Sequence, residues 1–260
     1  MKKIFLLLSA LWLISPVQAQ HMLRLMTYNI KNANGMDDIC NFQRVANVIN
    51  NVSPDVVAIQ EVDSMTNRSR QKNVLGEIAE RTQMYAYFAP AIDFDGGKYG
   101  IGLLAKQIPV RVQTIALPGR EETRTLILAE FEDYIYCCTH LSLTEEDRMK
   151  SLEIVKSFTA SYKKPLFLAG DMNAEPESDF IKELQKNFQI LSNPKQSTYP
   201  APDPKETIDY ITALKSNANG FALISSQVLN EPMASDHRPI LVELCTAEMA
   251  DKKFRTKPYD

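Results

Sequence analysis

Carboxylate, amide and imidazole side chains gather at the ends of apolar runs in this sequence. Together such groups can hold a divalent cation, activate a water molecule and donate protons, which are the steps of metal-assisted ester hydrolysis. A carboxylate beside buried apolar residues is costly to desolvate unless it binds a metal, a proton or a cation, so the carboxylates here need a common explanation. The polar groups in question are Asn29, Gln60-Glu61, His140, Asp171, Asn173, Asp209 and Asp236-His237.

Each of these residues also has a structural explanation when it is considered alone. Glu61 could be a surface charge at a strand end, and Asn29 could form a turn. Asp171 and Asn173 could belong to an Asx-type turn, and Asp236 could end or turn a segment. His140 alone is more typical of a hydrogen-bonded strand histidine. Only the combination of these residues, in this order along the chain, favours chemistry.

The elements that position these side chains can be read from the apolar patterns. Strands outnumber helices, and several strands follow one another through hairpin-length links, so the pattern favours a layered α+β domain over a regular βαβ array. Thr144 followed by Asp147 resembles a capping box at the start of a helix. The predicted strands are residues 23–30, 55–62, 100–104, 126–131, 134–139, 165–169, 207–212 and 239–244, and the predicted helices are residues 37–52, 73–82, 144–162 and 178–187.

Seven short motifs occur in one order over nearly the whole chain, from Leu23 to Leu244. This series resembles the endonuclease/exonuclease/phosphatase superfamily, the deoxyribonuclease I-like hydrolases. The resemblance implies a four-layer α/β/β/α sandwich, in which two β-sheets pack face to face between outer helices and the active site lies at one rim. The motifs are Thr27-Tyr28-Asn29-Ile30, Gln60-Glu61-Val62-Asp63, Gly100-Ile101-Gly102-Leu103-Leu104, Thr139-His140-Leu141, Gly170-Asp171-Met172-Asn173, Ile208-Asp209-Tyr210 and Ser235-Asp236-His237-Arg238-Pro239.

The resemblance also implies a metal site. Glu61 matches the metal ligand of the family, and Asn29 and Asp236 match its neighbours, as direct or water-mediated ligands. Hard oxygen ligands of this kind suit Mg²⁺ or Mn²⁺. Lys31 stands where some nuclease members carry an acidic residue of a second metal site, which favours a single metal ion.

Five further residues match the catalytic groups of the family. Asp171 matches the residue that orients or deprotonates the attacking water, and Asn173 would point to the same side in an extended segment and bind the nucleophile or a phosphoryl oxygen. His237 matches the catalytic histidine, with Asp209 placed to fix its tautomer and favour its protonated form. His140 matches a second histidine that donates a proton to the leaving oxygen or binds the phosphate.

The N-terminus has the pattern of an export signal. Lys2-Lys3 precedes an apolar run over residues 4–14, and Ala19 offers a small residue at the expected cleavage site. The run is shorter than the roughly 18 apolar residues of a membrane span. We therefore expect a signal peptide over residues 1–19, an endonuclease/exonuclease/phosphatase domain over residues 20–246 and a polar tail over residues 247–260, in a monomer exported to the periplasm or the medium.

Charge bears on the substrate. The chain has 29 basic and 32 acidic residues and no basic cluster in its body, which argues against a nonspecific duplex nuclease. We therefore expect a small-molecule or lipid-borne phosphoester as substrate, with an exported nuclease as the alternative. A ligand-binding protein without catalysis is a third class, which the intact catalytic set disfavours. Specificity is expected in the loops after Ile92 and around residues 191–205.

Two arginines and the four cysteines have less specific sequence patterns. Arg68 and Arg124 resemble arginines of bacterial relatives that could contact substrate phosphate, and ion pairs are the alternative role for both. The neighbours Cys137 and Cys138 should point to opposite faces of a strand as separate buried thiols. None of the four cysteines, which also include Cys40 and Cys245, has the spacing of a metal site.

Overall fold

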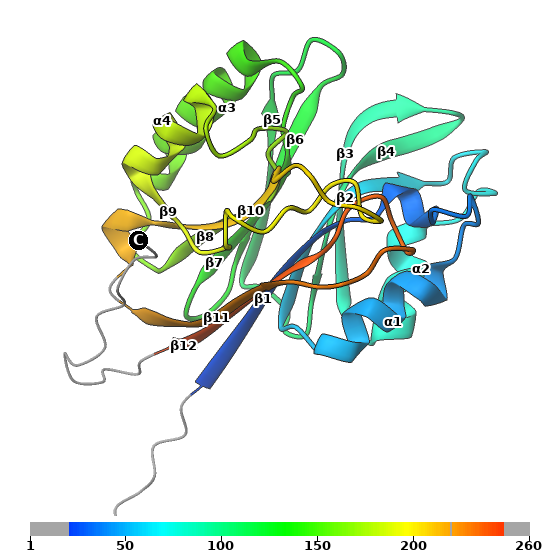
Figure 1. The fold of residues 1–260 in the computed structure, drawn as a ribbon, viewed down its shortest axis with the longest axis horizontal. Helices are drawn as coiled ribbons and strands as arrows, with labels where there is room; N and C mark the ends of the chain where they lie inside the picture. Colours follow the sequence, from blue (N-terminus) through cyan, green and yellow to red (C-terminus); the bar gives the residue numbers. More distant parts are fainter. Residues whose placement is uncertain (1–20, 219, 247–260) are drawn as a thin grey trace, which may run out of the picture.

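The computed structural model describes residues 21–218 and 220–246. The expected signal peptide and polar tail lie outside these residues. Two six-stranded mixed sheets pack face to face, with two α-helices on the outer side of each (Figure 1). The helices are α1 (Phe42–Val52), α2 (Val74–Thr82), α3 (Glu145–Thr159) and α4 (Asp179–Asn187), with short 3-10 turns η1 (Lys31–Ala33) and η2 (Lys215–Asn217).

The first sheet has the strand order β11-β12-β1-β2-β4-β3. Its only parallel pair within the described chain is β1 with β2, where Asn29 lies opposite Gln60. The carboxyl ends of these two strands therefore meet at one edge of the sheet. The strands are β1 (His21–Asn29), β2 (Val56–Ser64), β3 (Tyr85–Phe94), β4 (Gly97–Ala105), β11 (Phe221–Val228) and β12 (Ile240–Thr246).

The second sheet has the strand order β5-β6-β7-β8-β10-β9. Strands β7 and β8 are parallel, with His140 opposite Asp171, and β10 runs antiparallel to β8 with Asp209 opposite Asp171. The end of β8 therefore has a functional side chain on each neighbouring strand. The strands are β5 (Arg111–Leu117), β6 (Arg124–Glu130), β7 (Ile135–His140), β8 (Leu166–Asp171), β9 (Phe188–Ile190) and β10 (Asp209–Leu214).

Alternation along the strands divides the apolar residues into three layers. In β4, Ile101, Leu103 and Ala105 belong to the core between the two sheets, whereas Leu104 packs with α1 and α2. A third cluster joins the second sheet to α3 and α4. Cys137 and Cys138 follow the same rule, because both are buried but in different clusters. The four-layer sandwich expected from the sequence is thus confirmed.

All eight predicted strands are present, and the four that the apolar patterns missed are β3, β5, β9 and β11. These four are the edge strands of the two sheets. Edge strands pair on one side only, and β3, β5 and β11 are largely half-exposed, so their sequences lack continuous apolar runs. β3 also contains Pro90, which lies at a register shift against β4 and is tolerated at an edge.

Two details of the helix prediction are wrong. Helix α1 begins at Phe42 rather than Asp37, because the Asn41 side chain accepts a hydrogen bond from the Arg44 amide and caps the helix there. Thr144 makes no side-chain cap at the start of α3. The Asp147 carboxylate binds the Arg120 guanidinium and backbone amide instead of serving a capping box.

Candidate active site

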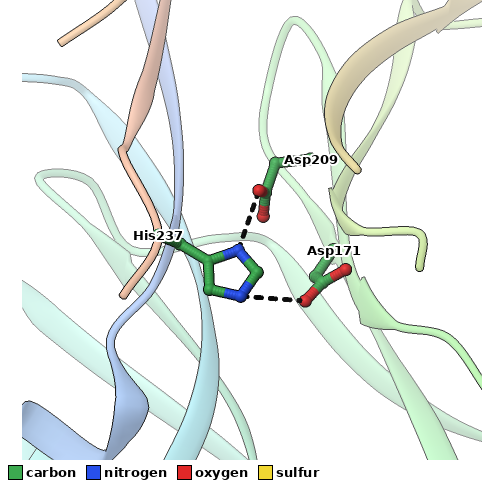
Figure 2. A group of neighbouring side chains, drawn as sticks. All are labelled: Asp171, Asp209 and His237. Atoms are coloured by element: carbon green, nitrogen blue, oxygen red, sulfur yellow. Dashed lines mark hydrogen bonds and ion pairs between the residues drawn. The ribbon is translucent and has the colours of Figure 1, made fainter. Parts of the chain in front are cut away.

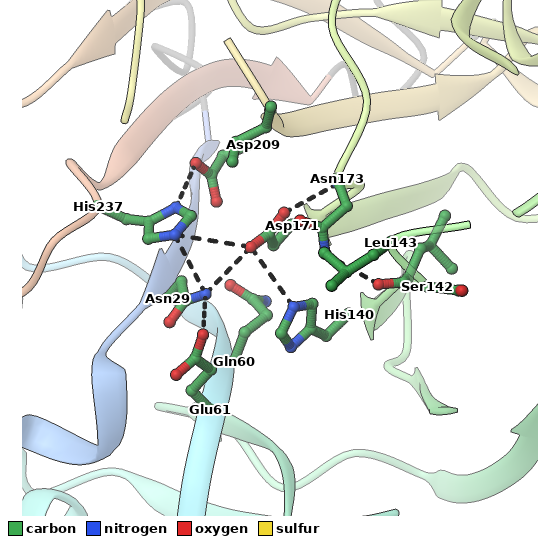
Figure 3. A network of polar contacts seen from close by, with 12 residues as sticks. Asn29, Gln60, Glu61, His140, Ser142, Leu143, Asp171, Asn173, Asp209 and His237 are labelled. Atoms are coloured by element: carbon green, nitrogen blue, oxygen red, sulfur yellow. Dashed lines mark hydrogen bonds and ion pairs between the residues drawn. The ribbon is translucent and has the colours of Figure 1, made fainter. Parts of the chain in front are cut away.

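The predicted site residues come together at one rim of the sandwich, between the two sheets (Figure 3). The first sheet supplies Asn29 from the end of β1 and Glu61 from β2. The second sheet supplies His140, Asp171 and Asp209 from β7, β8 and β10. The segment just before β12 adds His237. Both parallel strand pairs end at this rim, which explains why residues far apart in the sequence meet there.

Asn29 joins the two sheets through one amide group. Its Nδ2 donates to Glu61 Oε1 at 3.0 Å and to Asp171 Oδ2 at 3.0 Å, and its Oδ1 accepts from the Lys31 amide at 3.1 Å. Asn29 is fully buried. Because one amide nitrogen contacts both carboxylates, Asn29 fixes the separation of Glu61 and Asp171.

Glu61 occupies an irregular position in β2. The register against β4 shifts between Ile59 and Val62, and Glu61 has a positive φ of 57°, which is unusual for a residue with a side chain. Such a bulge redirects a side chain out of the strand alternation. Here it turns the carboxylate toward Asn29. Local strain at this position is consistent with a functional role.

Electrostatics at Glu61 favour a cation. Burial raises the pKa of the Glu61 carboxyl above its usual value, the hydrogen bond from Asn29 opposes this, and the negative charge of Asp236 adds to it. Among the described residues only Oε1 has a hydrogen-bond partner, so Oε2 is available for a ligand. A half-buried carboxylate with an available oxygen beside other oxygen ligands suits a hard divalent cation such as Mg²⁺.

His237 lies against the Asp209 carboxylate (Figure 2). The two are joined from His237 Nδ1 to Asp209 Oδ2 at 2.9 Å, and the Thr198 hydroxyl donates to the same oxygen at 2.6 Å. Burial lowers the pKa of His237, but attraction to the Asp209 charge and the hydrogen bond outweigh it and raise that pKa to about 10. The imidazole is therefore protonated at neutral pH and can donate from Nε2 toward the site.

Asp171 is the centre of the network. Its Oδ2 faces His140 Nε2 at 3.5 Å and His237 Nε2 at 3.7 Å, in addition to the Asn29 amide. β7 and β8 approach closely here, because a Cβ on Gly170 would lie 1.9 Å from the Thr139 carbonyl oxygen. Only glycine allows this approach, which sets His140 beside Asp171.

Asn173 is near Asp171 but not in the predicted extended conformation. It has a φ of 49°, and its backbone amide donates to Asp171 Oδ1 at 2.9 Å. Its side-chain Nδ2 donates to the Leu141 carbonyl at 2.9 Å. The segment is thus an Asx-type turn in which Asn173 orients Asp171 and ties β7 to β8.

His140 differs from His237 in its electrostatic surroundings. Burial lowers its pKa to about 4, although the charge of Asp171 acts in the opposite direction. The imidazole is therefore neutral at neutral pH. A neutral imidazole can donate one hydrogen bond to a phosphoryl or leaving oxygen, but it is a weaker acid than the imidazolium of His237.

Asp236 lies near Glu61 without a direct contact, which leaves the water-mediated role among the two that the resemblance implies. Within the described chain its carboxylate contacts Lys31 Nζ at 3.8 Å and the Ser235 hydroxyl at 3.3 Å, and neither Glu61 nor Asn29. Its charge still raises the pKa of Glu61. This arrangement fits an outer position near a metal ion better than a shared direct contact.

Ligand atoms of Asp171, Asp209 and His237 lie within 4.8 Å of one another, a second arrangement that could hold a cation. We interpret this trio as a hydrogen-bonded network, because Asp209 Oδ2 already contacts His237 Nδ1 and the Thr198 hydroxyl. Glu61 and Asn29 therefore remain the better candidates for the metal site.

Sequence reasoning missed three supporting residues. Thr198 orients Asp209, Ser235 donates from its hydroxyl to the Asn29 carbonyl at 2.7 Å, and Gly170 permits the strand approach. Ser235 and Gly170 stand inside motifs, so their neighbours gave a signal. Thr198 lies in the loop of residues 191–205, where nothing but its position ahead of Asp209 could have indicated its role.

Arg68 and Arg124 both form ion pairs. Arg124 is only 6% exposed and contacts Glu121 at 3.2 Å and Glu122 at 2.8 Å. Arg68 binds the Asp63 carboxylate through two nitrogens. Contact of either arginine with a substrate phosphate stays a prediction.

Comparison with known proteins agrees with this geometry. Residues 26–237 match the model of the endonuclease/exonuclease/phosphatase family. The chain belongs to this family. Its members are hydrolases that act on phosphoesters and generally require a divalent metal ion. No curated protein sequence matches the chain.

Similar solved structures show the same fold. A family protein from Bacteroides vulgatus is 19% identical with a TM-score of 0.71, covering 88% of this chain and 100% of its own. One from Beutenbergia cavernae is 20% identical with a TM-score of 0.70, covering 86% and 72%. A mannosyl-6-phosphatase from Bacteroides thetaiotaomicron is 16% identical with a TM-score of 0.66, covering 85% and 99%. Within the part of this chain that the structure describes, no helix has the length and apolar character to cross a membrane.

Proposed function

We propose that this protein is a divalent-metal-dependent phosphoesterase in which water attacks a small-molecule or lipid-borne phosphoester in line with the leaving oxygen. One observation carries the proposal. Asp171 Oδ2 lies between the Asn29 amide, which also holds Glu61, and the Nε2 atoms of His140 and His237. A base, two histidine donors and, through Asn29, a candidate metal ligand thus meet at one carboxylate oxygen, an arrangement that suits attack on a tetrahedral phosphorus.

Each side chain has a task that its environment supports. Asp171 orients the water and accepts its proton, since the Asn173 amide and the Asn29 amide fix both carboxylate oxygens. The His237 imidazolium stabilises charge that develops on the phosphoryl oxygens. His140 donates a hydrogen bond toward the leaving oxygen.

The metal ion would be held by Glu61 Oε2 and by the amide oxygen of Asn29, Oδ1, with Asp236 in an outer position. Mg²⁺ or Mn²⁺ there neutralises phosphoryl charge when bound. Lys31, which lies 3.8 Å from Asp236, places a positive charge where a second cation would otherwise bind. This arrangement supports a one-metal site.

Charge favours small or lipid-borne substrates over duplex nucleic acid. The chain carries a formal net charge of −3, and the candidate site itself is lined by four carboxylates, Glu61, Asp171, Asp209 and Asp236. Duplex binding draws on many phosphate contacts with basic side chains. A neighbour of the same fold is named as a mannosyl-6-phosphatase, which supports a small phosphorylated substrate without deciding it. An exported nuclease is the second candidate.

A substrate panel tests the proposal. Purified protein is assayed with Mg²⁺ or Mn²⁺ on bis-p-nitrophenyl phosphate, sugar phosphates, phosphoinositides, sphingomyelin, RNA and plasmid DNA. We expect hydrolysis of a small or lipid-borne ester that stops after exhaustive chelation and returns with the metal. Full activity without the metal would overturn the metal assignment, and no hydrolysis of any member would favour the binding-only alternative.

We also propose export, on the N-terminal pattern of the sequence alone. In a bacterial host the mature protein should be recovered outside the cytoplasm with its N-terminus at Gln20. N-terminal sequencing of that fraction tests the cleavage site. A cytoplasmic protein that retains residues 1–19 would contradict it.

A further inference from the structure

A hollow opens at the tip of the β3–β4 hairpin, beside the candidate active site. It has a volume of about 540 Å³ and is lined by Ser64, Met65 and residues 93–98. Ser64 ends β2, the strand that carries Glu61. Three residues of strand span about 10 Å, so the hollow begins roughly that far from Glu61.

Arg68 lies next to this hollow and contacts two of the residues that line it, Phe94 and Asp95. Its Nε and Nη2 donate to the fully buried Asp63 carboxylate at 2.6 and 2.7 Å. The fixed guanidinium lies over the Phe94 ring at 4.4 Å and over the Tyr99 ring at 5.6 Å. Its backbone amide also donates to Asp95 Oδ2 at 2.7 Å, which ties the hairpin tip to the loop after β2. The hollow is therefore preformed.

The residues around the Arg68 guanidinium, Asp63, Phe94 and Tyr99, form what we call the Arg68 cluster. Strand alternation directs this cluster toward the catalytic rim. The face of β4 toward the gap between the sheets carries Ile101, Leu103 and Ala105. Tyr99 lies two residues before Ile101 in the same strand, so its side chain is on that face too. Asp63 lies opposite Tyr99 in the β2–β4 pairing. Tyr99 also lines a small cavity together with His140. The Arg68 cluster thus lies at the mouth of the gap that holds the catalytic residues.

The chemistry of the lining selects among the alcohols that a phosphoester can carry. The lining carries two carboxylates, Asp93 and Asp95, against one cation, Lys98, which pairs with Asp93. The remaining negative charge disfavours a second phosphate group. A quaternary ammonium group needs several free ring faces, and here the guanidinium of Arg68 already lies over both rings.

A neutral, hydroxyl-rich ring fits the remaining groups. The Asp93 side chain is 81% exposed, and although its Oδ1 pairs with Lys98, its Oδ2 can accept hydrogen bonds from hydroxyl groups, as can the Ser64 hydroxyl. Met65 and Phe94 are 52% and 38% exposed and offer apolar contact to the C–H face of such a ring. Carboxylate acceptors beside an apolar surface match an uncharged polyol.

We propose that this hollow binds the uncharged, hydroxyl-rich alcohol portion of the substrate, a sugar or cyclitol ring, while its phosphate lies at Glu61 and Asp171. The inference rests on the proposed function and names the substrate class of that site. It assigns specificity to the hairpin tip, in the loop after Ile92.

Three matched esters test the selectivity: p-nitrophenyl phosphodiesters of inositol, choline and methanol, which differ only in the second alcohol and release the same product. We expect kcat/KM for the inositol ester to exceed both others by about tenfold, equivalent to about 1.4 kcal/mol. Equal rates on all three, or preference for the choline ester, would overturn the inference while leaving the proposed hydrolase intact.

Substitutions in the hollow test whether its residues cause the selectivity for the inositol ester. Phe94→Ala should raise KM for the inositol ester about tenfold and change the methyl ester less than about twofold. Asp93→Asn is the second variant, because its exposed side chain keeps its size and leaves Arg68 in place. Tyr85→Ala is the matched control, since Tyr85 is a 48% exposed aromatic residue at the opposite end of β3. Selectivity retained in both hollow variants would exclude this site.

A binding measurement separates this inference from the proposed function. Titration of the protein with myo-inositol alone, followed by NMR, should shift signals of the hairpin tip in the wild type and in Tyr85→Ala but not in Phe94→Ala. Binding of inositol without any ester hydrolysis would refute the hydrolase and support the hollow. No binding would refute the hollow. Phosphatidylinositol vesicles, compared with soluble inositol 1-phosphate, show whether the ring comes from a lipid head group or from a free phosphate ester.

Discussion

The pairing of Asp209 with His237 makes the sharpest quantitative prediction. Asp209→Asn keeps the shape of the side chain and removes its charge. The Asp209 carboxylate accepts from His237 Nδ1 at 2.9 Å and from the Thr198 hydroxyl at 2.6 Å, and all three groups are buried. The substitution therefore acts on the protonation and orientation of His237 rather than on packing.

The size of the effect follows from the kind of bond that is lost. A hydrogen bond to a charged group contributes roughly 1.5–3 kcal/mol. If that energy serves the transition state, kcat should fall by roughly 10- to 150-fold in Asp209→Asn. His237→Ala should lose at least as much, because it removes the imidazolium itself.

The double variant is the informative measurement. If Asp209 acts only through His237, the double variant should be little worse than His237→Ala alone, because residues that work as a unit give non-additive losses. Steady-state hydrolysis is measured across cation concentrations for the wild type and the three variants. Circular dichroism and thermal unfolding serve as folding controls.

Additive losses in folded variants would refute this pairing. Such a result would mean that Asp209 contributes independently of His237, for example through its second oxygen. Asp209 Oδ1 is buried and has no hydrogen-bond partner in the described part of the chain, so it is the atom that an independent role would use.

Further predictions concern the metal, a supporting hydroxyl, pH and nucleic acid. Glu61→Gln should raise the cation concentration for half-maximal rate by at least about tenfold, measured by titration with Mg²⁺. Thr198→Val removes a hydrogen bond to the charged Asp209 carboxylate, so it should lower kcat by up to roughly 10- to 150-fold with little change in KM, and Thr198→Ser should restore it. Burial raises the pKa of Glu121, but hydrogen bonds from its own amide, the Leu143 amide, Ser142 and Arg124 outweigh it and lower that pKa from 4.5 to about 2. Because this pKa is lower in the folded state, Glu121→Gln should destabilise the protein by about 1 kcal/mol above pH 4.5, and the difference should vanish in denaturant unfolding as the pH falls toward 2. Plasmid nicking should be weak beside hydrolysis of the best small or lipid-borne ester, and efficient nicking with a steep salt dependence would instead support a nuclease.

The sequence predicted the interior of the fold better than its edges. The eight strands that pair on both sides carry continuous apolar runs, for example Ile135 to His140, because both faces of each are covered. The edge strands β3, β5 and β11 alternate between exposed and half-buried residues, so burial left a weaker pattern in their sequences. Long-range pairing, rather than local preference, makes these segments strands.

The membership of the site was predictable because each polar group stands in a motif at a strand end. Its geometry was not. The prediction for Asn173 assumed an extended strand. In the structure Asn173 has a left-handed backbone conformation, and its side-chain amide donates to the Leu141 carbonyl. The role of Thr198 depends on the fold of a long loop that returns to β10, and no local pattern specifies that return.

The bulge at Glu61 connects the metal site with the hairpin. After the register shift, Val62 packs under the outer helices and Asp63 faces the gap between the sheets. Without the bulge Val62 and Asp63 would each lie on the opposite face of the sheet, and the Asp63 carboxylate would point away from Arg68. The same bulge that turns Glu61 toward Asn29 therefore also places Asp63, the carboxylate that binds Arg68 beside the β3–β4 tip. The position of the catalytic carboxylate and the shape of the neighbouring hollow depend on one backbone feature, so a change that removes the bulge should alter metal affinity and alcohol selectivity together.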